Sequence, residues 1–306
     1  MNILLTGASG QLGHELLPLL AQFGQVTTVD QFVDSAISRE CIKLDLSDLN
    51  RVEILLNRLR PDLVVNAAAF TAVDKAENDS ERAFRVNAEL PGCIARWIER
   101  NGRLLLHYST DYVFDGQAGQ PYKETDETGP LNVYGESKLA AEWAIAASKC
   151  RFIVLRTSWV YSAHGSNFVL SMLRLAKERP ELSIVSDQTG CPTWARNLAG
   201  ASREVIVRLL KYKTDSKKDG LYHYCDSTIT TWYEFARSIF NTALDLGLLD
   251  EIPRMLPVKS SQFPQIAQRP GYSVLDNTAI RDTFGIESMS LSRSLAACLQ
   301  GLEDDK

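Results

Sequence analysis

The sequence of 306 residues is poor in several features that would point to particular classes of protein. No apolar run approaches the roughly 20 residues of a membrane-spanning helix, and Met1–Thr6 lacks the basic segment and cleavage site of a signal peptide. The six cysteines are scattered without C-x-x-C or zinc-like spacing, which favours reduced thiols and no metal site. The 33 basic and 38 acidic residues give no basic excess, so we expect no nucleic-acid partner. We predict a cytoplasmic protein without a membrane partner.

Short apolar runs alternate with helical patterns through the first half of the chain. A strand at 1–6 precedes a helix at 11–23, and five further strands are expected at 25–30, 41–44, 62–69, 103–109 and 151–159. Intervening helices are expected at 52–60, 80–100 (kinked near Pro91) and 134–147. Strands that are apolar on both faces and separated by helices predict a parallel sheet covered on both sides. The fold class is therefore α/β, with a doubly wound parallel sheet of the Rossmann type.

The regular alternation of apolar runs and helical patterns becomes weaker after about residue 160. Helices are expected at 167–178, 194–211 and 231–246, with short strands at 182–185 and 221–224, whereas 253–281 shows little periodicity. We predict a dinucleotide-binding domain over 1–160. Residues 161–306 are expected to form a smaller α/β region that mainly binds substrate, with some segments returning to the first domain.

A glycine-rich loop joins the first strand to the first helix. Gly7, Gly10 and Gly13, with Gln11 and Leu12 between them, fit G-x-x-G-x-x-G. Glycines there allow a tight turn and a close approach of the backbone to a pyrophosphate, which the helix N-terminus stabilises. Tight-turn glycines alone would look the same, but the position between strand and helix favours dinucleotide binding.

Further cofactor contacts are expected at the ends of the next strands. Asp30 ends the second strand, where a carboxylate can bind ribose hydroxyls and would repel a 2′-phosphate, which leans towards NADH; a surface turn is the alternative. Asp45 and Leu46 could line an adenine pocket or begin a helix. Three small residues would leave room for a cofactor or for close helix packing: Ala67, Ala68 and Ala69.

Acid–base chemistry is suggested by Tyr134 and Lys138, which form Y-x-x-x-K on one helix face. A nearby ammonium would lower the pKa of a tyrosine from its usual value near 10. In isolation this spacing is common on solvated helices, but here it follows a sheet that begins with a glycine loop. Thr110 or Ser109, at the end of the preceding strand, could supply a third hydroxyl, or could simply close that strand as a turn.

Several stretches, in order and nearly end to end, resemble the dTDP-4-dehydrorhamnose reductases, a branch of the extended short-chain dehydrogenases/reductases. They include GASGQLGHE at 7–15, VVNAAAFTAVDKAE at 64–77, HYSTDYVFDG at 107–116, PLNVYGESKLAAE at 130–142, VSDQTGCPT at 185–193 and RPGYSVLD at 269–276. The resemblance implies that NADH or NADPH reduces the C4 keto group of a dTDP-4-keto-6-deoxy sugar, dTDP-6-deoxy-L-lyxo-4-hexulose, to give dTDP-L-rhamnose. Two other functions stay open: a dinucleotide-binding regulatory subunit like that of methionine adenosyltransferase, and a related nucleotide-sugar epimerase or dehydratase.

The resemblance also assigns residues. Tyr134 would be the general acid, Lys138 would orient the nicotinamide ribose, and Thr110 would bind the substrate carbonyl. Substrate contacts are expected from Thr110, Asp111, Trp159, Asn167 and Arg269. Without the resemblance, core packing for Trp159 and a surface ion pair for Arg269 would be favoured.

This sequence departs from the resemblance at one place. Some members dimerise through magnesium held by glutamates, and Glu15 matches one ligand, but Arg196 stands where the second acid is expected. A guanidinium cannot ligate Mg²⁺, which takes oxygen ligands. We therefore expect no metal, and a monomer or a metal-independent homodimer.

Overall fold

A computed structural model describes residues 1–32, 41–211 and 218–304, and its centre is a seven-stranded parallel sheet in the order β11-β6-β5-β4-β1-β2-β3. The strands of this sheet are β1 (Asn2–Thr6), β2 (Gln25–Asp30), β3 (Ile42–Lys43), β4 (Leu63–Asn66), β5 (Leu104–Thr110), β6 (Arg151–Thr157) and β11 (Gly220–His223). The order reverses at β1, which pairs with β2 on one side and with β4 on the other. The doubly wound fold predicted from the alternating pattern is thus confirmed, and a switch point of this kind is where such sheets bind ligands.

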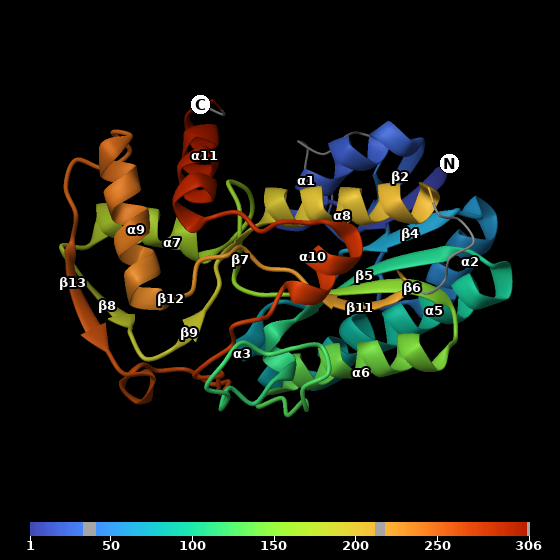
Figure 1. The fold of residues 1–306 in the computed structure, drawn as a ribbon, viewed down its shortest axis with the longest axis horizontal. Coiled ribbons are helices and arrows are strands. Elements are labelled where there is room, and N and C mark those ends of the chain that lie inside the picture. Colours follow the sequence, from blue (N-terminus) through green and yellow to red (C-terminus); the bar gives the residue numbers. More distant parts are fainter. Residues whose placement is uncertain (33–40, 212–217, 305–306) are drawn as a thin grey trace.

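Two layers of helices cover the sheet (Figure 1). One face carries α1 (Gln11–Leu20), α8 (Ala195–Lys211) and α10 (Thr278–Phe284), whose apolar side chains share a buried cluster with Leu5 and Leu106. The other face carries α2 (Leu49–Leu59), α5 (Leu90–Asn101) and α6 (Val133–Ala147), which pack around Leu4 and Val154. Alternate residues of each strand therefore enter separate cores, which is why the strands read as continuous apolar runs.

Most of the described residues after 160 form a smaller group of elements beside the carboxyl ends of the strands (Figure 1). Its helices are α7 (Phe168–Glu178), α9 (Trp232–Asp245) and α11 (Leu291–Asp304). Its strands pair two by two: β13 (Arg254–Val258) with β8 (Glu181–Val185), β12 (Thr230–Thr231) with β9 (Thr189–Gly190), and β10 (Thr193–Trp194) with β7 (Val160–Tyr161). These elements enclose a third apolar cluster that includes Phe235 and Phe240.

Four features differ from the sequence-based expectation: one helix is divided, and three further elements were not predicted. The helix expected over 80–100 is divided into α4 (Ser80–Phe84), a π-helical turn (Arg85–Glu89) and α5, so the irregularity precedes Pro91. Asn87, within the π turn, bonds the backbone of Phe70 and the Ser137 hydroxyl, which ties the widened turn to α6. Strand β13, helix α10 and helix α11 were not predicted, since two are short and α11 follows a stretch with little periodicity.

One element of the second half belongs to the main sheet. β11 pairs in parallel with β6, with Gly220 opposite Ile153 and His223 opposite Arg156. The sheet therefore has seven strands, one more than the first half of the sequence supplies. α8, also from the second half, packs along α1. In the described ranges, no helix combines the length and the apolar character needed to cross a membrane.

Candidate active site

The glycine loop lies between β1 and α1, as predicted, and its glycines are sterically required. Gly7 has a φ of +69°, and a Cβ atom there would lie 2.5 Å from the Ala68 backbone nitrogen. A Cβ on Gly13 would lie 2.1 Å from the Gly7 carbonyl oxygen. Gly10 precedes α1 and caps it without a side-chain hydrogen bond, so the first N–H groups of this helix have no side-chain acceptor at the cap. A cradle of this form fits a dinucleotide pyrophosphate.

A cavity of about 440 Å³ opens from this loop along the strand ends. Of the thirteen residues predicted to bind the cofactor, all but Gly13 line it: Gly7, Gly10, Gln11, Leu12, Asp30, Asp45, Leu46, Ala67, Ala68, Ala69, Tyr134 and Lys138. Gly13 instead lies beneath the loop, where its missing side chain lets α1 approach Gly7. Cavities of this size hold cofactors and drug-sized ligands.

Asp30 has a second task besides any ligand contact. One of its carboxylate oxygens accepts the backbone N–H of Ser9 at 2.9 Å, so it fixes the glycine loop from the neighbouring strand. Phe32, two residues on, is 73% exposed and lines the same cavity. A ring that is exposed beside such a carboxylate offers a flat face to a planar base. Sequence analysis missed Phe32, although its position just past Asp30 is a usable signal.

Tyr134 and Lys138 project from the first turns of α6. Asn132 caps this helix, because its side-chain oxygen accepts the Gly135 N–H at 2.8 Å. Burial raises the pKa of Tyr134 to about 12, although a hydrogen bond with the Thr110 hydroxyl lowers it. The expectation that Lys138 lowers the pKa of Tyr134 is therefore wrong, because Lys138 directs its ammonium to the Tyr108 carbonyl at 2.6 Å.

Lys138 is almost fully buried, and burial lowers its pKa to about 8, while the charge of Glu142 raises it. Its Nζ also lies 3.4 Å from Nε2 of His107, whose Nδ1 lies 3.0 Å from the Asn66 amide nitrogen. Burial holds the pKa of His107 well below its usual value, so this ring is neutral near pH 7.

The two hydroxyls considered at the end of β5 have different partners. Ser109 donates to Oε1 of Glu142 at 2.5 Å, within a buried group that includes the Arg156–Glu142 ion pair. Thr110 donates to Asp111 at 3.0 Å and is the one that meets Tyr134. Burial also raises the pKa of Asp111 to about 7, against the hydrogen bonds from Ser273 and Thr110. Thr110 therefore suits the substrate carbonyl better than Ser109 does.

None of the five predicted substrate residues, Thr110 and Asp111 included, is among the residues that line this cavity. Trp159, with a φ of +46°, stacks on Trp232 with ring centroids 3.6 Å apart. Asn167 caps α7 and also donates to the Ser162 and His164 carbonyls, so its amide already serves the local structure. Arg269 forms an ion pair with Asp74 that is partly buried rather than fully on the surface.

Comparison with known proteins adds the family. The model of the family described as RmlD substrate binding domain matches residues 1–303. The chain belongs to this family. It is 41% identical to the dTDP-4-dehydrorhamnose reductase of Burkholderia thailandensis over 99% of each chain. A solved dTDP-4-dehydrorhamnose reductase from Clostridium acetobutylicum superposes with a TM-score of 0.87 at 34% identity, covering 99% of this chain and 100% of that one. A Bacillus anthracis counterpart in complex with NADP gives 0.84 at 32% identity, with 98% and 99% covered.

Proposed function

We propose that the chain reduces the C4 keto group of dTDP-6-deoxy-L-lyxo-4-hexulose to give dTDP-L-rhamnose, with NADH or NADPH as the reductant. The observation that carries the proposal is the hydrogen bond of Thr110 with Tyr134, which itself lines a cavity that continues to the glycine loop. Membership of the family and 41% identity to a named dTDP-4-dehydrorhamnose reductase support the same reaction.

The cavity fits a nicotinamide dinucleotide, which supplies the hydride when it is bound. In this proposal Gly7, Gly10, Gln11 and Leu12 hold the pyrophosphate, and Asp30 binds ribose hydroxyls. The adenine lies against Asp45 and Leu46, and Ala67, Ala68 and Ala69 leave room along the strand end. These residues all border one continuous space, which supports their joint assignment.

Tyr134 acts as the general acid. With a pKa of about 12, its hydroxyl is protonated near neutral pH and can give its proton to the oxygen of the former C4 carbonyl. Thr110 binds the same oxygen through its hydroxyl. The Lys138 ammonium, held by the Tyr108 carbonyl, stabilises negative charge that develops on this oxygen and orients the nicotinamide ribose.

The sugar nucleotide would lie between residues 1–160 and residues 161–306, the two regions that we propose as cofactor and substrate domains. Asp111, beside Thr110, can accept a sugar hydroxyl. Trp159 offers a flat apolar face to the sugar ring. Asn167 and Arg269 complete the proposed contacts, and the Arg269 fork suits a diphosphate.

The test is loss of absorbance at the reduced-nicotinamide band. Purified protein is mixed with NADH or NADPH, a dTDP-4-keto-6-deoxy sugar and a 3,5-epimerase that supplies the substrate. We expect a steady loss that needs every component and yields dTDP-rhamnose. Tyr134→Phe should lose nearly all turnover yet bind cofactor as the wild type does, because the phenyl ring keeps the shape and loses only the proton. Full activity in this variant would refute the acid role.

A further inference from the structure

Helix α3 (Val73–Asn78) carries two carboxylates, Asp74 and Glu77, to which no role has been given so far. They are three residues apart and therefore lie on one face of the helix. Glu77 accepts the backbone N–H of Val133 at 2.9 Å, and Val133 is the first residue of α6. One carboxylate of α3 is thus attached to the start of the helix that carries Tyr134.

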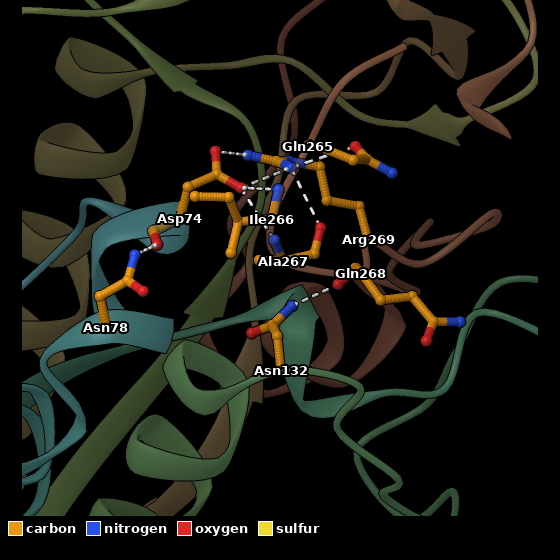
Figure 2. Close-up of polar contacts among 8 residues, drawn as sticks. All are labelled: Asp74, Asn78, Asn132, Gln265, Ile266, Ala267, Gln268 and Arg269. Atoms are coloured by element: carbon orange, nitrogen blue, oxygen red, sulfur yellow. Dashed lines mark hydrogen bonds and ion pairs between the residues drawn. The ribbon is translucent and has the colours of Figure 1, made fainter. Parts of the chain in front are cut away.

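Asp74 holds a different segment, residues 265–269, which we call the strap (Figure 2). Oδ1 of Asp74 accepts the backbone N–H groups of Ile266 at 3.1 Å and Ala267 at 2.9 Å. Both terminal nitrogens of Arg269 also donate to Asp74, at 2.6 and 3.2 Å. Asp74 therefore fixes the backbone of the strap and the direction of its arginine together.

A second attachment comes from the catalytic helix. Asn132, the cap of α6, donates its amide hydrogen to the Gln268 carbonyl at 2.7 Å (Figure 2). Apolar packing contributes less, because Ile266 is 66% exposed and Ala267 offers only a methyl group. The hydrogen bond from Arg269 holds the pKa of Asp74 below its usual value, so the carboxylate is charged near neutral pH. The strap is consequently held by polar bonds, with Asp74 making most of them.

The strap is connected to the active site through Arg269. This guanidinium hydrogen-bonds the Tyr112 hydroxyl. The Tyr112 ring in turn packs edge-on against Tyr134, with centroids 5.7 Å apart and planes at 81°. Arg269 is therefore held one ring away from the proposed general acid, and the glycine loop makes none of these contacts.

We propose that Asp74 is a positioning residue for the sugar-nucleotide substrate, acting through Arg269 and the strap. The inference rests on the proposed function, in which Arg269 binds the diphosphate. Asp74 presents the arginine in a fixed orientation before substrate arrives, so little side-chain freedom is lost on binding. It touches neither the keto group nor the cofactor cavity, and it therefore affects substrate affinity rather than the chemical step.

Two variants separate its two tasks. Asp74→Asn keeps an oxygen that can accept the Ile266 and Ala267 N–H groups but loses the charge that orients Arg269, and Asp74→Ala loses both. We expect the KM for the sugar nucleotide to rise roughly tenfold in Asp74→Asn, as for loss of one charge-assisted bond, and further in Asp74→Ala. The kcat should stay within about threefold of wild type, since Tyr134 and Thr110 are untouched. Affinity for NADPH should not change.

Asp62→Asn is the matched control. Asp62 also pairs with an arginine, Arg103, and accepts a backbone N–H, from Asn2, but it lies just before β4, at the amino ends of the strands and thus opposite their carboxyl ends. The Asp62→Asn substitution should lower the stability of the protein without changing its KM for the sugar nucleotide. In an Arg269→Gln background, Asp74→Asn should have no further effect on the KM, because the arginine through which Asp74 acts is already absent. If Asp74 had an independent structural role, the effects of the two substitutions would instead add.

The outcomes are distinct. An unchanged KM in folded Asp74→Asn and Asp74→Ala would overturn the proposal, as would full additivity with Arg269→Gln. Loss of NADPH affinity in parallel with the KM effect would also overturn it, by showing general damage. Wild-type protein is assayed first: if it does not turn over the keto sugar, the proposed function fails by itself. Direct binding of dTDP to the same variants then still tests the strap.

Discussion

Burial shifts the pKa values of Tyr134 and Lys138, both on α6, in opposite directions. It raises the pKa of Tyr134 to about 12, because the phenolate is the charged form, and lowers the pKa of Lys138 to about 8, because the ammonium is. Near neutral pH the site therefore holds a protonated acid and a cation, four residues apart on α6. Both are the forms that reduction of a carbonyl needs, since negative charge appears on its oxygen.

A pH dependence follows for turnover. The ammonium of Lys138 is present below its pKa and is lost as the pH rises through about 8. We expect kcat at saturating substrates to be level near neutral pH and to fall by up to tenfold per unit above about pH 8. A series of steady-state rates from about pH 6 to about pH 10 measures this.

Lys138→Arg provides the comparison, because a guanidinium keeps its proton throughout this range. The kcat that remains in this variant should not decrease as the pH rises above about 8. A wild-type kcat that stays level to about pH 10 would show that this lysine does not limit turnover through its charge.

At the level of single residues, sequence analysis found those that local motifs specify. The glycine loop and the Tyr134–Lys138 pair are set by spacing within one turn or one helix. The contact of Asp74 with Arg269 joins positions 195 residues apart, and no spacing rule predicts it. Tyr112 was quoted within a motif but given no role, because only the folded chain places it between Arg269 and Tyr134.

At the scale of elements, the glycine loop between β1 and α1 leaves no room for a side chain at Gly7. Gly7→Ala should lose more than about 1 kcal/mol of stability, since φ is positive and the new methyl group would meet the Ala68 backbone. It should also weaken NADPH binding by displacing the loop. Urea unfolding and fluorescence titration with NADPH measure the two effects.

Gly200→Ala is the control for the loop. Gly200 lies within α8, and a Cβ there would have no neighbour within 4 Å among the residues that the structure describes. Alanine should stabilise this helix by roughly 0.5–1 kcal/mol and leave NADPH binding as it is. Wild-type stability and binding in Gly7→Ala would contradict the steric argument.

The helices and strands also differ in how well they can be predicted from their sequences. Most predicted strands and helices of the first half agree with the structure to within a few residues, because each has a strong apolar period. β13 was missed because it carries Pro257 and is only partly buried, so it lacks that period. β11 was expected as a strand, but its membership of the main sheet depends on pairing with β6, which the sequence does not encode locally.

For the whole molecule, the ion pair of Arg196 with Glu15 bears on assembly. Nε of Arg196 lies 2.9 Å from a carboxylate oxygen of the largely buried Glu15. Within the described ranges no group of three or more potential ligands is arranged for a metal. We predict that magnesium leaves the sedimentation coefficient unchanged, because a guanidinium occupies the position beside the carboxylate. A shift on titration with Mg²⁺ that EDTA reverses would contradict this.

The interleaving of the two halves limits how such proteins can be recombined. β11 and α8 come from the second half of the sequence, yet one completes the main sheet and the other covers it against α1. A hybrid joined near residue 160 would combine a sheet from one parent with an edge strand and a covering helix from another. To exchange sugar specificity between relatives as a cassette, an engineer would have to leave these two elements with the recipient and transplant the intervening segments separately.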